Sequence, residues 1–338
     1  MKTQAIKKRN IGIDILRALS TLYIVGFWHL FTYTTAFPQH NNALTYKLTL
    51  GILGTFVLIS GHFIGEKDLQ MTKSDIAKFF QRRLLRIYPL YILALGLFTT
   101  LKISNLTISL KAALLISMFV KPAPLTLWFI TMLLLFYFIS PLFIHASKTL
   151  ETQQFIGYYM IAVLLLITYS VFTKMLDTRL LLYSPAFILG IHIAKNDINI
   201  SIGKYKIYYL AALIISFLLS FVTTPYEELN AIINAPMVLL FSHLFFNVAK
   251  RLIIRSEQVR KTISFLSYSS YAMYLFHRPI YDIAKRIYFP ETPAAQAVYL
   301  LVFCLPLITL CSFMIQKFYD IALDKLNRTF RKEAAITA

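Results

Sequence analysis

The sequence predicts an all-α integral membrane protein, a polytopic bundle of about ten transmembrane helices in one domain over residues 1–338. Three observations predict this fold class. Hydrophobic residues make up 58% of the chain and charged residues only 14%, whereas soluble domains are nearer a quarter charged. Apolar blocks of spanning length, about 20 residues each, recur along the whole chain. The basic residues gather on alternate connecting segments, as expected for cytoplasmic loops.

Hydropathy places the spans in order along the chain, and no long linker or repeat divides them. The basic start, MKTQAIKKRN, resembles the beginning of a signal peptide, but the next apolar stretch is too long and lacks a cleavage site, so we expect an uncleaved first span. The stretch 107–120 is too short to cross and is expected to be re-entrant or interfacial. The expected spans are 11–31, 48–65, 88–103, 124–146, 155–173, 180–195, 206–223, 231–249, 264–284 and 296–318.

An even number of spans places both termini on one side of the membrane. If that side is cytoplasmic, the inner segments hold about three times as many Lys and Arg residues as the outer ones. The net charge of +19 is therefore interpreted as a membrane-orientation signal, and no nucleic-acid partner is expected. We expect a multi-pass protein of a bacterial cytoplasmic (inner) membrane with the lipid bilayer as its surroundings and both termini inside.

Two cytoplasmic segments combine apolar and basic residues at helical spacing, which is typical of helices lying in the interface. One is residues 319–331, within the cytoplasmic C-terminal tail, residues 319–338. The other is the loop 66–87, where Arg82, Arg83 and Arg86 form a basic stripe on an amphipathic helix. Two interpretations stay open for this stripe: contact with lipid headgroups, or a site for phosphate groups, which guanidinium forks match geometrically.

Ionisable residues inside the spans are the candidate functional residues, because exposure of such side chains to lipid costs much free energy. Asp14 and Arg17 share one helix face; they either form a simple stabilising salt bridge or belong to a site. His29 lies near the outer end of the same span and is either a snorkelling polar tip or a catalytic group. His277, next to Arg278, either faces a cavity or pairs locally at a helix broken by proline. The sequence contains no metal-site, Walker or GxSxG pattern, so no metal is expected.

Five stretches occur together in one order: IDILRALSTLYIVGFWH, GTFVLISGHFI, FFQRRLLRIYPLY, LWFITMLLLFYFISPL and ISFLSYSSYAMYLFHRPI. In this order the chain resembles the bacterial membrane-bound acyltransferase-3 family, whose members O-acylate polysaccharides. The resemblance covers residues 13 to 280. It implies acyl-CoA, usually acetyl-CoA, as a cytoplasmic co-substrate, a glycan acceptor reached from outside, and contact with polysaccharide-synthesis machinery. It also implies a catalytic base at His29, preceded by the family arginine at Arg17, and a donor-binding basic motif at Arg82, Arg83 and Arg86.

One departure from the family pattern concerns the first span. The family has ten residues between its arginine and its histidine, and this chain has eleven, so a regular helix would turn His29 off the Arg17 face. We expect a one-residue π-bulge near Gly26 to restore the alignment. Two further departures are His62 and Arg278, which stand where the family commonly has apolar residues.

The sequence therefore predicts an acetyl-CoA-dependent O-acetyltransferase acting on a hydroxyl of a cell-surface polysaccharide or lipid-linked sugar. The catalytic residues are expected to be His29, Arg17 and Asp14, with CoA held by Arg82, Arg83 and Arg86. Residues expected to line the acceptor site are Trp128, Tyr137 and His277. The alternative function is a polysaccharide or lipid-linked sugar transporter or export subunit, whose intramembrane ions would line a path.

Overall fold

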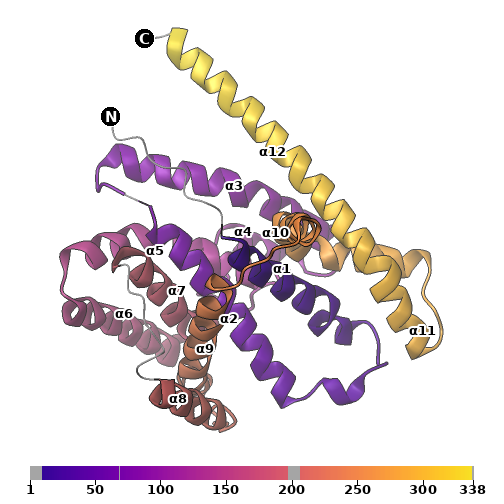
Figure 1. Cartoon of the computed structure of the whole chain (residues 1–338), viewed down its shortest axis with the longest axis horizontal. Helices are drawn as coiled ribbons and strands as arrows, with labels where there is room; N and C mark the ends of the chain where they lie inside the picture. Colours follow the sequence, from indigo (N-terminus) through magenta and orange to yellow (C-terminus); the bar gives the residue numbers. More distant parts are fainter. Residues whose placement is uncertain (1–9, 68, 197–205, 337–338) are drawn as a thin grey trace.

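The computed structural model describes residues 10–67, 69–196 and 206–336, and every regular element within these ranges is helical (Figure 1). The basic N-terminal residues 1–9 and part of the loop at 195–206 lie outside the described residues. The basic residues expected on the cytoplasmic side in these two segments therefore stay a prediction. The elements are α1 (Ile11–Gly26), two 3-10 turns (Trp28–Thr32 and Pro38–His40), α2 (Ala43–Gly65), α3 (Lys73–Thr100), α4 (Leu106–Ala113), α5 (Trp128–Thr149), α6 (Thr152–Thr173), α7 (Arg179–Asn196), α8 (Lys206–Leu219), α9 (Glu227–Lys250), α10 (Glu257–Ile287), α11 (Pro293–Val298), a π-helical segment (Tyr299–Cys304) and α12 (Leu305–Ile336).

Six helical segments in the described part of the chain are long and apolar enough to cross a bilayer, which confirms an all-α membrane protein; the count of ten spans stays a prediction. The expected span at 264–284 falls within α10, whose polar residues keep it below this apolar limit. Figure 1 shows α10 beside α1, and the α10 polar residues Ser267, Ser270 and His277 are buried. The six segments are Ile11–Thr32, Ala43–Gly65, Trp128–Thr149, Thr152–Thr173, Glu227–Lys250 and Pro293–Leu326.

One expected boundary between an interfacial and a spanning helix is absent from the described chain. The amphipathic part of the 66–87 loop and the next span form one continuous helix, α3. The stretch 107–120 overlaps the eight-residue α4 (Leu106–Ala113), which is too short to cross, as the sequence predicts.

Helix α3 continues through Pro89 because a partner replaces the hydrogen bond that proline removes. Proline has no N–H to donate to the carbonyl four residues earlier, which here belongs to Leu85. The Tyr319 hydroxyl of α12 donates to that carbonyl oxygen instead. Two residues further along α3, the Tyr271 hydroxyl of α10 donates to the Ile87 carbonyl at 2.7 Å. The proline thus ties α3 to α10 and α12.

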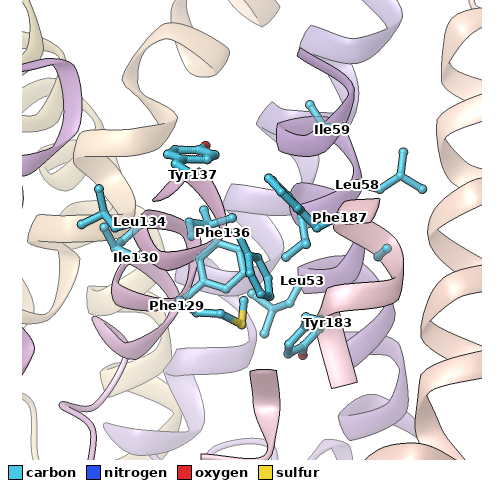
Figure 2. Packing of buried hydrophobic residues seen from close by; sticks show 14 of the residues in the cluster. Leu53, Leu58, Ile59, Phe129, Ile130, Leu134, Phe136, Tyr137, Tyr183 and Phe187 are labelled. Atoms are coloured by element: carbon cyan, nitrogen blue, oxygen red, sulfur yellow. The ribbon is translucent and has the colours of Figure 1, made fainter. Parts of the chain in front are cut away.

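Glycines bring α2 and α7 close together at the core of the bundle. A Cβ on Gly61 would lie 2.1 Å from the Phe187 carbonyl oxygen, and one on Gly190 would lie 2.2 Å from that of Leu58. Small residues of this kind let membrane helices approach to backbone contact. The Phe187 ring then stacks on Phe136 of α5, with centroids 5.0 Å apart, in the apolar cluster of Figure 2. This rigid core supports the helices that hold the candidate site.

Candidate functional site

The N-terminal half of α1 is fixed against α10 by two hydrogen bonds that involve its ionisable residues. Asn10 caps the helix, with its side-chain oxygen 2.9 Å from the Gly12 amide. One turn on, the buried Asp14 carboxylate accepts a 2.8 Å bond from the Ser267 hydroxyl. Arg17 donates from Nη2 to the Ser270 hydroxyl at 3.1 Å. Asp14 and Arg17 therefore do lie on one face, and that face meets α10.

Helix α1 ends near Gly26 by a break, so the expected π-bulge there is wrong. The Phe27 amide still bonds the Tyr23 carbonyl at 3.0 Å, but the Phe27 torsions, φ −125° and ψ −64°, leave the helical region. The next bond, from the Leu30 amide to the Phe27 carbonyl at 3.1 Å, spans three residues, as in the tighter 3-10 helix. The helical turn is therefore narrower here than in an α-helix, whereas a π-bulge would make it wider. The new direction of the chain at Phe27 brings His29 toward α10.

The imidazoles of His29 and His277 stack face to face. Their centroids are 4.7 Å apart and their planes differ by 3°. Nδ1 of His277 lies 2.9 Å from the Tyr274 carbonyl oxygen. A carbonyl only accepts, so Nδ1 holds the proton and Nε2 presents a lone pair. Nε2 of His277 and Nδ1 of His29 are buried without a hydrogen-bond partner among the described residues. The pair therefore places unused proton-accepting capacity inside the bundle.

His29 also lines a cavity of about 480 Å³ beside the 3-10 turn. The cavity is amphiphilic, with two indoles, two guanidinium groups, a histidine and small polar side chains in its wall, and none of the described residues that line it carries a carboxylate. Such a mixture of aromatic surface and a few polar groups suits a small polar ligand. The lining residues are Trp28, His29, Phe31, Thr32, Asn41, Ala123, Leu125, Thr126, Trp128, Arg179 and Arg278.

Two cations of this cavity, Arg179 and Arg278, are absent from the predicted site. The Arg179 guanidinium lies 4.0 Å from the centroid of the Trp128 ring and pairs with Asp177, with Nε 2.7 Å from Oδ1. Arg278 is only 9% exposed. The position of Arg278 inside an expected span could have indicated a functional role from the sequence. Asp177 and Arg179 lie between two expected spans, where such a pair is typical of an ordinary loop ion pair.

The predicted donor-binding arginines lie on α3, away from His29. Arg82 and Arg86 are exposed and Arg83 is half-buried. The Arg83 guanidinium lies over the Tyr137 ring, 5.8 Å from its centroid, and over the Phe79 ring at 6.0 Å. Burial lowers the pKa of the Arg83 guanidinium, which stays protonated because arginine titrates far above neutrality.

Trp128 and Tyr137 do not line one cavity. They are nine residues apart on α5, a rise of about 13 Å, and only Trp128 reaches the His29 cavity. Tyr137 belongs to the Arg83 end. His277 does not itself line the cavity but supports the ring of His29, which does.

Buried hydroxyl groups occupy the bundle between the two ends. The Tyr91 hydroxyl lies 2.6 Å from the Thr131 hydroxyl, and the Tyr274 hydroxyl donates to the Thr126 carbonyl at 2.8 Å. The Thr126 hydroxyl is buried without a partner among the described residues. Ser270, Tyr274 and His277 follow one another turn by turn along α10. The arrangement provides polar groups from the arginine end to the histidine end.

Residues 10–316 match a family model described as an acyltransferase domain. The match includes α1, α3, α5 and α10, and hence every residue of the two ends described above. No curated protein and no solved structure matches this chain significantly.

Proposed function

The chain belongs to the acyltransferase-3 family and is a membrane acyltransferase; from this premise we propose that it transfers an acetyl group from acetyl-CoA to a hydroxyl of a cell-surface polysaccharide or lipid-linked sugar. The proposal rests on one observation. A single pair of neighbouring helices, α1 and α10, extends from the Asp14–Ser267 contact to the stacked His29–His277 pair. A donor at one end and an acceptor at the other could meet beside these helices.

The CoA phosphates bind at the α3 arginines. Arg82 and Arg86 are exposed and can form charge-assisted hydrogen bonds to phosphate oxygens. Arg83 is held over Tyr137 and adds a third, fixed positive charge to the phosphate site. The flexible pantetheine arm then extends into the bundle past Arg17 and the buried hydroxyls, bringing the thioester toward His29.

His29 acts as the general base of the reaction. It removes the proton of the acceptor hydroxyl while the oxygen forms a bond to the thioester carbonyl carbon. The tetrahedral intermediate collapses when the carbon–sulfur bond breaks, and the proton held by His29 passes to the departing CoA thiolate. His277 holds the His29 ring in place by stacking. Asp14 and Arg17 position α1 through their bonds to Ser267 and Ser270.

We place the α3 arginines and both termini on the cytoplasmic face of a bacterial inner membrane. The positive-inside rule supports this orientation, and the metabolic pool of acyl-CoA is cytoplasmic. The His29 cavity then opens toward the opposite face, where a glycan acceptor is available.

The test combines donor binding with group transfer. The purified full-length protein in detergent is expected to bind CoA in calorimetry and to move label from acetyl-CoA to a glycan acceptor. The Arg82→Gln/Arg86→Gln variant should lose CoA affinity. A polysaccharide transporter would bind the glycan without binding CoA, and that result would overturn the proposed function.

A further inference from the structure

Arg278 is a buried cation that lines the His29 cavity and forms no ion pair with a carboxylate of the described residues. Its side chain is 9% exposed and its Nε has no hydrogen-bond partner among the described residues. The acid one turn later on α10, Asp282, forms an ion pair with Arg286 at 2.7 Å. The Tyr33 hydroxyl is a neutral hydrogen-bond partner of the guanidinium, which forms no ion pair within the described residues. A buried charge that lacks an ion pair is costly, so the site favours an anion that supplies one.

The second arginine of the cavity is already compensated. Arg179 is held in a two-point contact by Asp177 and lies flat over Trp128. No Asp or Glu of the described residues lines the cavity wall. The guanidinium that lacks an ion pair is therefore that of Arg278, which lines the cavity together with His29.

We propose that the acceptor has an anionic group, a carboxylate or a phosphate, close to the hydroxyl that is acylated, and that Arg278 binds this group. The inference rests on the proposed function, since it names the chemical class of its acceptor. A guanidinium matches both oxyanions through parallel N–H donors. Sugars bearing carboxylates or phosphates present such a group a few bonds from a free hydroxyl. Binding it at Arg278 would place that hydroxyl beside His29.

A different role for Arg278, stabilising the oxyanion of the tetrahedral intermediate, makes a different kinetic prediction. An oxyanion-stabilising group raises kcat for every acceptor. An anion-binding group lowers KM for charged acceptors and leaves neutral acceptors unaffected. Loss of the Arg278 guanidinium thus separates the two roles.

The chain contains a built-in reporter for occupancy of this cavity. It has only two tryptophans, and both of them, Trp28 and Trp128, line the cavity. Ligand binding is therefore readable as a change in intrinsic fluorescence, without any turnover. This readout does not depend on the identity of the acyl donor.

The experiment titrates the full-length protein in detergent with two matched pairs of probes. Methyl glucuronide is compared with methyl glucoside, and glucose 1-phosphate with the methyl glucoside of the same anomeric form. The anionic member of at least one pair should bind about tenfold more tightly, the effect of one charge-assisted contact. Preference for the carboxylate or for the phosphate identifies which anion the site accepts.

Arg278→Gln should bring the charged and neutral probes to equal affinity, and Arg278→Lys, which keeps the charge but not the fork, should retain part of the preference. The matched control is Arg260→Gln, an exposed arginine near the start of α10 that pairs with Glu257 and does not line the cavity; its preference should be unchanged. Retained CoA affinity shows that each variant is folded.

Equal binding of charged and neutral probes, no fluorescence response to any probe, or an unchanged preference in Arg278→Gln would overturn the inference. Acyl-transfer assays on the same probes separate this failure from failure of the proposed function. Transfer to charged and neutral acceptors alike, without a binding preference, removes the anion site and leaves the acyltransferase. A binding preference without any transfer keeps the anion site and removes the proposed reaction.

Discussion

Removal of the Ser267 hydroxyl should destabilise the protein through Asp14. The two side chains are almost fully buried, and the 2.8 Å bond between them is charge-assisted. Ser267→Ala leaves one carboxylate oxygen without this donor, a loss of about 1.5–3 kcal/mol. An unfolding entropy of about 2.1 cal/mol/K per residue over 338 residues converts this loss to a fall in Tm of about 2–4 °C.

Thermal unfolding in detergent, followed by size-exclusion fluorescence, measures this shift. The matched control is Ser269→Ala on the same helix, where the hydroxyl donates at 2.9 Å to the Phe265 carbonyl. That carbonyl keeps its backbone bond within α10, so the control should lose less. In an Asp14→Ala background, Ser267→Ala should also lose little, because the pair is already broken. The reasoning fails if Ser267→Ala equals its control, or loses the same stability with and without Asp14.

Three further changes test the fold and the donor site. Gly61→Ala places a methyl group 2.1 Å from a backbone oxygen of α7. It should lower the free energy of unfolding by at least about 1–3 kcal/mol, measured as a reduced Tm. An unchanged Tm would contradict the close approach of α2 and α7. Tyr319→Phe leaves the Leu85 carbonyl without its donor and should lose about 1–3 kcal/mol, measured the same way. Arg86→Gln should weaken CoA binding about tenfold in calorimetry, while the exposed Arg255→Gln should not; equal effects would indicate non-specific charge.

Part of the site could be predicted from the sequence because charge in an apolar span is conspicuous. Asp14, Arg17 and His29 stand out in the first span, and the structure places all three against α10. Their partners Ser267 and Ser270 could not be predicted, because serines are unremarkable in a helix and lie more than 250 residues away.

The separation of Trp128 from Tyr137 was within reach of helical geometry. Nine residues at 100° each bring two side chains to opposite faces of a helix, so one cavity could not hold both. The membership of Arg179 in the cavity was out of reach, since it depends on how the start of α7 packs beside α5. The sequence predicted the position of the helix irregularity near Gly26 but not its type, a break followed by a 3-10 turn. The spacing of Arg17 and His29 indicates that the helix must deviate, but not whether it tightens or widens.

In the proposed reaction His29, which stacks on His277 of α10, accepts the proton of the acceptor hydroxyl. The most direct measurement is single-turnover transfer of labelled acetyl groups by His29→Ala, with CoA affinity measured on the same preparation. We expect the transfer rate of His29→Ala to fall about 10²–10⁴-fold with CoA binding unchanged. A transfer rate equal to that of the unaltered protein would contradict it.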